Sequence, residues 1–242
     1  MVYRTGQMRY PQTQLCTSKY CIAYLDILGS KNLIDNDKNN EFLNYLNMLC
    51  HDALLEASSN KDIFIKIFSD NILLAVNTEC EAQIRKERIE VLINRVGNIQ
   101  NEILRYGYLV RGAIVEGDFF HNDVIVYGKA LVKAVTDEEQ IAIYPRVIVQ
   151  KDIFELLPHY FIMDEDNLVF LNQFIFSHAL EYVNFKHQLL EMLKKNPDEK
   201  YKQRIMWVIN YYNNYLSFNK TKLSAETFIT KQDIIARIND IL

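Results

Sequence analysis

The chain has 242 residues, of which 49% are hydrophobic and 12% aromatic, with seven glycines and four prolines. This composition excludes a disordered protein and a long flexible linker, and it predicts one large domain or a core domain with a helical extension. The formal net charge of −4 argues against sequence-independent binding of nucleic acid, which requires a basic surface.

The cysteines and the N-terminal segment indicate the compartment. Cys16, Cys21, Cys50 and Cys80 lack C-x-x-C spacing and lie in apolar or helical contexts, which favours buried free thiols in a reducing cytosol. Residues 1–18 form a polar N-terminal segment without the apolar core of a signal peptide, and no stretch approaches the length of a membrane span. We therefore expect a cytoplasmic protein that has no membrane partner.

Residues 19–150 alternate between strand and helix patterns. The predicted strands and helices follow the order β-α-β-β-α-β-β-α-β. Their ranges are 19–27, 40–58, 62–68, 71–77, 79–105, 108–120, 124–127, 128–139 and 144–149. Helices on an antiparallel sheet with a split β-α-β core predict an α+β fold of the ferredoxin-like palm type.

Residues 151–242 have a different character and predict a mainly helical C-terminal extension. We expect a helix at 152–157, a short hairpin around 164–167, helices at 174–195 and 198–218, and a loop with a short helix after 220. This extension would pack on the palm or on a second subunit, and the sequence does not assign it a role.

Two aspartates mark the candidate site, because each lies where an apolar strand ends. Asp26 lies at the end of the strand at 19–27, and Asp70 lies in the turn between two further strands. Carboxylates are rare in such surroundings unless they are paired or bind metal. If the strands are neighbours, the two acids meet and could hold divalent ions. The structural alternatives are a helix N-cap for Asp26 and an ordinary turn residue for Asp70.

Four motifs resemble those of the class III nucleotidyl cyclases. YLDILGS at 24–30 is similar to that family's first metal motif, F-x-D-I-x-G-F, and KIFSD at 66–70 is similar to K-x-x-G-D. The segments GAIVEG at 112–117 and YGKALV at 127–132 match later family motifs more weakly. The resemblance covers residues 19–150 and implies a palm that dimerises head to tail.

The resemblance implies a cofactor and a reaction. Asp26, the backbone carbonyl of Ile27 and Asp70 would bind two Mg²⁺ or Mn²⁺ ions, and a nucleoside triphosphate would become a cyclic nucleotide and pyrophosphate. Lys66 occupies the position of a base-contacting lysine. Gly29 and Ser30 would allow a helix N-terminus to approach phosphate.

The chain also departs from the family pattern. Val132 and Thr136 stand where the family has its transition-state Asn and Arg, and Ile125 stands at the second base-selecting position. Either other cations substitute for the missing pair, or the chain binds nucleotides without converting them. The nearby candidates are Arg111, Lys133 and Arg146, each of which has an alternative interpretation as a surface charge.

A chain with no attached sensor is similar to the stand-alone pyrimidine cyclases of Pycsar anti-phage systems, which act with a separate effector that responds to the cyclic nucleotide. The leading hypothesis is a homodimeric, metal-dependent nucleotide cyclase in bacterial defence signalling, and the base remains open. The alternatives are an inactive, cyclase-like nucleotide-binding module and another palm enzyme, although Phe68 to Asn71 lacks the G-G-D/E-D/E hairpin.

Overall fold

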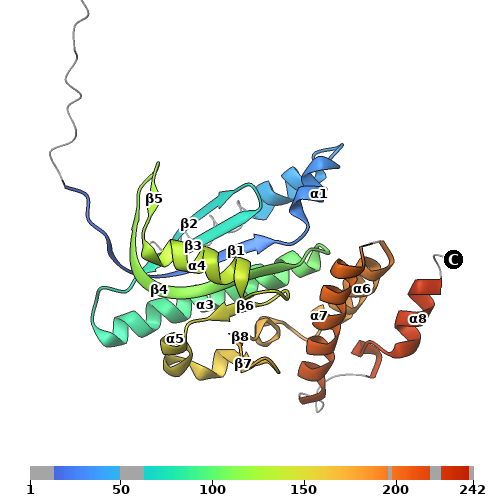
Figure 1. Cartoon of the computed structure of the whole chain (residues 1–242). Coiled ribbons are helices and arrows are strands. Elements are labelled where there is room, and N and C mark those ends of the chain that lie inside the picture. The colour runs from blue at the N-terminus through green and yellow to red at the C-terminus, as the bar shows by residue number, and fades with distance from the viewer. Residues whose placement is uncertain (1–13, 50–62, 196–197, 219–224, 240–242) are drawn as a thin grey trace, which may run out of the picture.

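The computed structural model describes residues 14–49, 63–195, 198–218 and 225–239. An eight-stranded sheet forms its centre, in the order β2-β3-β1-β4-β6-β8-β7, with β5 paired to β4 outside this order (Figure 1). The strands are β1 (Ser18–Ile27), β2 (Ile63–Phe68), β3 (Asn71–Asn77), β4 (Val110–His121), β5 (Val126–Tyr127), β6 (Val147–Val149), β7 (Phe161–Met163) and β8 (Val169–Leu171).

Helices alternate with these strands along the chain. Residues 41–49 are also helical, and the rest of the helix predicted at 40–58 lies outside the described residues. The α-helices are α1 (Ser30–Asp35), α3 (Ala82–Arg105), α4 (Lys129–Gln140), α5 (Lys151–Leu156), α6 (Glu181–Lys195), α7 (Glu199–Phe218) and α8 (Lys231–Asn239). Short 3₁₀ helices are η1 (Pro158–Tyr160), η2 (Gln173–Phe176) and η4 (Ala225–Thr227).

The strands β2, β3, β1 and β4 form the predicted split core. Each neighbouring pair among them is antiparallel, and β1 lies between β3 and β4 although it comes first in the chain. This is the arrangement of a β-α-β-β-α-β palm, so the predicted α+β fold is confirmed. The register places Asp26 opposite Asn71 of β3 and Arg111 of β4.

The two faces of the palm sheet carry separate apolar cores. Alternation along β1 directs Ala23 and Leu25 to the core that contains α3, and Ile22 and Tyr24 to the core that contains α4. Figure 1 shows α4 and α3 on opposite sides of the sheet. Small residues bring α4 close to β4, because a Cβ on Gly117 would lie 3.4 Å from that of Ala130.

The sheet continues past residue 150, where the sequence predicted the palm to end. Strand β6 runs parallel to β4, and β8 and β7 then extend the sheet as the predicted hairpin. The helices α6 and α7 share an apolar cluster with Leu28, Leu104 and Leu109 of the palm. The extension therefore packs on the palm of its own chain.

Two sequence predictions are wrong at the level of local structure. Residues 174–180 are not α-helical, because η2 ends at Phe176 and α6 begins only at Glu181. Cys16 and Cys80 are free thiols but exposed, whereas Cys21 is free and buried as predicted, and Cys50 lies outside the described residues.

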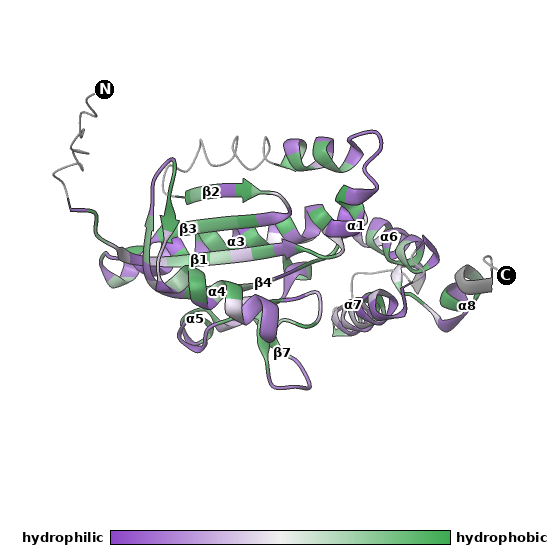
Figure 2. Cartoon of the chain, turned by 45° about the horizontal axis from the view of Figure 1, so that its top comes forward, coloured by the Kyte–Doolittle hydropathy of each residue, from purple (hydrophilic) through white to green (hydrophobic). Residues whose placement is uncertain are grey.

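Hydrophobic residues follow the inner strands and alternate with hydrophilic ones on the helices (Figure 2). Within the described ranges, no helix is both long and apolar enough to cross a membrane.

Candidate functional site

The structure brings Asp26 and Asp70 together. Asp26 is the next-to-last residue of β1, and Asp70 lies in the turn between β2 and β3. The amide of Ile27 donates to the backbone carbonyl of Asp70 at 3.1 Å, which joins the two segments. Burial raises the pKa of Asp26 and the nearby Asp70 carboxyl adds to that rise, so the two acids lie within each other's electrostatic reach. Asp26 is not a helix cap, because Gly29 is the N-cap residue of α1.

Neutral side chains orient Asp70. The hydroxyl of Ser30 donates to Oδ2 of Asp70, and Nδ2 of Asn71 donates to Oδ1 at 3.1 Å. The hydroxyl of Tyr24 in turn donates to Oδ1 of Asn71 at 2.5 Å. These bonds fix the direction of the carboxylate, while no cation pairs with it among the described residues. Its negative charge is therefore available to a ligand.

Arg111 is shared between two acids. Its Nε lies 3.3 Å from Oδ2 of Asp26 and 2.5 Å from Oε1 of Glu138. Burial raises the pKa of Asp26, Arg111 opposes that rise, and Asp70 adds to it. Burial also raises the pKa of Glu138, to about 7, against the effect of Arg111. The site thus places Asp26 and Glu138 on one arginine, in surroundings that disfavour the ionisation of these two acids.

Sequence analysis missed Glu138. It is 3% exposed and lies on the buried face of α4, following Ala130 and Ala134 at four-residue spacing. The sequence does contain a signal for it: Glu138 continues the four-residue spacing of two alanines, which places it on the buried face of a helix. An acid on such a face needs a partner.

The C-terminal extension brings a second cation, Arg204 of α7, to the same end of the sheet. Its charge interacts with Arg111 and with Asp26, and burial lowers its pKa. Arg204 is half-buried and has no hydrogen bond or ion pair within the part of the chain that the structure describes. One turn earlier, the ring of Tyr201 would lie 3.3 Å from a Cβ on Gly29, so α7 covers the loop after Asp26.

Three other predicted residues lie near this site. Lys66 is half-buried on β2, opposite Leu73, and has no hydrogen-bond or ion-pair partner among the described residues. Gly29 adopts φ +80°, which favours glycine, and Ser30 is bound to Asp70. The helix that follows Gly29 is only six residues long, and the ring of Tyr201 lies beside the glycine, which stays exposed. The approach of this helix terminus to phosphate stays a prediction.

Two of the three candidate substitute cations are occupied elsewhere. Lys133 pairs with Asp137 at 2.6 Å on the exposed side of α4. Arg146 is 1% exposed and binds Asp164 and Asp166 in the loop between β7 and β8. The prediction that these two cations serve the site is corrected, because carboxylates of the chain already neutralise them. Arg111 alone lies where it was expected.

The residues that replace the family's transition-state pair do not reach the acids. Val132 is 67% exposed, and the hydroxyl of Thr136 donates to the carbonyl of Val132 within α4 at 2.8 Å. Ile125, at the second base-selecting position, is 46% exposed in the hairpin of β4 and β5. No polar group at these positions is free to contact a substrate.

The acid pair fits a divalent cation supported by further oxygen ligands. Asp26 and Asp70 repel each other when both are ionised, and a shared cation relieves that repulsion. Mg²⁺ commonly binds to one or two carboxylates and completes its shell with water and substrate phosphates. Over the described ranges, no group of three or more His, Cys, Asp or Glu side chains could hold a metal by itself. The carbonyl of Ile27 stays a predicted ligand.

Comparison with solved structures finds similarity to adenylyl and guanylyl cyclase domains. The chain is similar to the adenylyl cyclase CyaB from P. aeruginosa, with TM-score 0.49 and 14% identity over 64% of this chain and 92% of that one. It is similar to the catalytic core of a rhodopsin-guanylyl cyclase with converted specificity, with TM-score 0.49 and 12% identity over 64% and 96%.

A bacterial light-regulated adenylyl cyclase has TM-score 0.44 and 16% identity, over 73% of this chain and 99% of the other. No family model and no curated protein matches the chain. These similarities are too low to transfer a function, which has to be argued from the residues of this chain.

Proposed function

We propose that this protein is a metal-dependent nucleotide cyclase, which converts a nucleoside triphosphate to a 3′,5′-cyclic nucleotide and pyrophosphate. The observation that carries the proposal is the meeting of Asp26 and Asp70 at one end of the palm sheet, within the two motifs that resemble those of cyclases. Two Mg²⁺ or Mn²⁺ ions bound there would activate the ribose 3′-oxygen and neutralise the triphosphate.

In this proposal, acidic residues bind the metal ions and a basic residue binds the triphosphate. Asp26 and Asp70 hold the cations, and Ser30 and Asn71 keep Asp70 in one orientation. Arg204 has no carboxylate partner among the described residues, so we assign it to the triphosphate. A half-buried guanidinium beside Arg111 is unfavourable until an anion joins it. In this assignment, Arg204 replaces the cation that is absent at Thr136.

Glu138 acts through Arg111. Its carboxylate lies 2.5 Å from Nε of Arg111, compared with 3.3 Å for Asp26, and thus draws the guanidinium away from the proposed metal ligand. Its negative charge also offsets the cations gathered at the site. Glu138 is therefore a positioning residue, because it keeps Asp26 available for metal.

Further parts of the proposal concern partners. A homodimer would complete the pocket, and Lys66 would contact the base. A cyclic-nucleotide-responsive effector and a role in anti-phage defence follow only from the resemblance to stand-alone cyclases. The choice of base stays open.

Incubation of the protein with Mn²⁺ or Mg²⁺ and each of the four nucleoside triphosphates, followed by mass spectrometry, tests the proposal. A cyclic mononucleotide and pyrophosphate are expected from at least one substrate, and Asp26→Ala or Asp70→Ala should abolish them. Asp118→Ala is the matched control, because Asp118 pairs with Lys19 on the surface. Absence of product from all four substrates with both metals would contradict cyclase activity.

A second candidate function is a nucleotide-binding module without turnover. The exposed Val132 and the internally bonded Thr136 favour it, because they leave the usual transition-state contacts unmade. This function would give a nucleotide-dependent increase in melting temperature without product. Both functions would be excluded if nucleotide neither raises the melting temperature nor is converted to product.

A further inference from the structure

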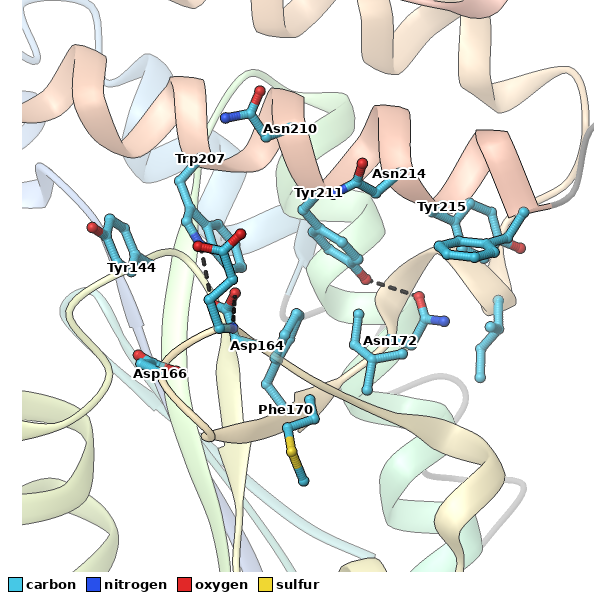
Figure 3. Close-up of a pocket in the computed structure, with 15 residues that line it drawn as sticks. Tyr144, Asp164, Asp166, Phe170, Asn172, Trp207, Asn210, Tyr211, Asn214 and Tyr215 are labelled. Carbon is cyan, nitrogen blue, oxygen red and sulfur yellow. Dashed lines mark hydrogen bonds between the residues drawn. The ribbon is translucent and has the colours of Figure 1, made fainter.

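A cavity of about 820 Å³ lies between the β7–β8 hairpin and α7, and the proposed function does not use it (Figure 3). We call it the hairpin cavity, and it is bounded by Tyr144, the loop from Met163 to Asp166, Asn172 and the face of α7 from Trp207 to Phe218. Its volume falls within the range of pockets that hold small molecules.

The wall of the hairpin cavity is aromatic and rigid. Trp207 lies parallel to Tyr144, with 5.4 Å between ring centroids, and Phe170 meets Tyr211 edge to face at 5.2 Å. The indole of Trp207 donates to Oδ2 of Asp164 at 3.1 Å, and the hydroxyl of Tyr211 donates to Oδ1 of Asn172 at 2.9 Å (Figure 3). These bonds hold the rings in place before any ligand binds, which lowers the entropic cost of binding.

The charged side chains that the structure describes in the lining are all acidic. Asp164, Glu165 and Asp166 contribute carboxylates, and no Lys, Arg or His is among the described lining residues. Arg146, which binds Asp164 and Asp166 from behind, offsets one of these charges. Glu165 is exposed, and its carboxylate has no partner among the described residues. Such a lining repels phosphate and attracts a cation.

The chain itself demonstrates which chemical group these side chains accept. The guanidinium of Arg146 lies 5.6 Å from the ring centroid of Tyr144, 5.9 Å from that of Phe170 and 5.8 Å from that of Trp207. The same rings and the same aspartates line the hairpin cavity. Aromatic faces and carboxylates together are a combination that binds ammonium and guanidinium groups.

We propose that the hairpin cavity binds a small organic cation, in which an amine or guanidinium group is attached to an apolar body. The cationic group would lie at Glu165, and the apolar body would lie against Trp207 and Tyr211. This assignment does not depend on the cyclase proposal. A regulatory role for the ligand rests on the proposed function, because it is argued from Trp207 lying one turn along α7 from Arg204, which is assigned to the triphosphate.

The experiment uses the fluorescence of Trp207, which is the only tryptophan of the chain. The full-length protein is titrated with agmatine, with spermidine and with adenosine monophosphate as an anionic aromatic probe. We expect a saturable change with at least one cation at a Kd below about 1 mM, and none with the nucleotide. Glu165→Gln should raise that Kd by about fivefold, the value of a partly exposed ion pair.

Two further variants give the titration its controls. Asn214→Phe places bulk on the exposed side of α7 that lines the cavity and should abolish the saturable change without unfolding the chain. Glu155→Gln removes a carboxylate from α5 and should leave the Kd unchanged. The proposal is overturned by no saturable response to either cation, by tighter binding of the nucleotide, or by a Kd that Glu165→Gln does not alter.

Discussion

Two clusters in which one arginine meets several carboxylates differ in the direction of their pKa shifts. In the hairpin cluster, formed by Arg146, Asp164 and Asp166, the bond to Arg146 lowers the pKa of Asp166. In the palm cluster, formed by Arg111, Asp26, Asp70 and Glu138, burial raises the pKa of Asp26 and of Glu138.

This contrast separates a structural cluster from a functional one. Arg146 is 1% exposed, and its bond lowers the pKa of Asp166, so the folded protein gains stability when Asp166 is ionised. In the palm cluster the pKa of Asp26 and of Glu138 is raised, so the folded protein loses stability when these two acids ionise, which is common where a protein prepares a site for a cation. A cluster that destabilises the free protein is explained by what it binds.

Asp26→Asn should remove activity without loss of stability. We expect turnover to fall about 1,000-fold, because the charge that holds the metal and phosphates disappears. The melting temperature should stay the same or rise, since burial already disfavours the ionised aspartate. Product assays and thermal unfolding of the same preparation measure both values. A large fall in melting temperature would instead show that Asp26 stabilises the fold, as the acids of the hairpin cluster do.

Arg146→Met should have the opposite result. It leaves Asp164 and Asp166, whose side chains are 20% and 45% exposed, without their cation, and we expect a loss of about 1–3 kcal/mol in the free energy of unfolding. Lys133→Met, which breaks the exposed pair with Asp137, should cost at most about 1 kcal/mol. Urea unfolding of the two variants measures both losses. Equal losses of unfolding free energy would show that the burial of Arg146 does not distinguish its ion pairs from the exposed pair of Lys133 and Asp137.

The palm cluster could be predicted from the sequence as far as it depends on strand ends. Asp26 and Asp70 close apolar strands, and a split β-α-β order places such ends side by side. Glu138 and Arg204 could not be assigned in this way. Their proximity to Arg111 depends on how α4 and α7 pack, which no local pattern records.

The errors have a similar origin. Arg146 is predicted at the site as a nearby cation that could replace the missing pair, but its partners Asp164 and Asp166 lie between β7 and β8, which join the sheet later in the chain. The apolar run from Phe174 resembled a helix. It is instead the short η2, whose Phe174 is fully buried against Tyr211 and Tyr212. Burial alone explains that apolar run without helical periodicity.

Arg204→Ala tests whether the extension serves the palm cluster. We expect KM for the nucleotide to rise about tenfold, the value of one charge-assisted contact, and Arg204→Lys should restore part of it. Lys202→Ala is the matched control, because Lys202 pairs with Glu199 on the same helix. An unchanged KM for Arg204→Ala would confine the extension to a structural role.

Glu138→Gln is expected to give the smallest effect, and its test depends on the direction in which the free energy of unfolding changes with pH. The pKa of Glu138 is raised from 4.5 to about 7, so the folded protein binds its proton more tightly than the unfolded chain does. This carboxyl therefore contributes a stability that falls as pH rises from 4.5 to about 7 and is then constant. The variant lacks this dependence, so the wild type should lose about 1–2 kcal/mol relative to it between pH 5 and pH 8. Urea unfolding of both proteins across that range measures the difference. If the unfolding free energies of the two proteins change with pH in parallel, Glu138 is ionised throughout and paired with Arg111, as the acids of the hairpin cluster are paired with Arg146. The distinction between the two clusters would then rest on Asp26 alone.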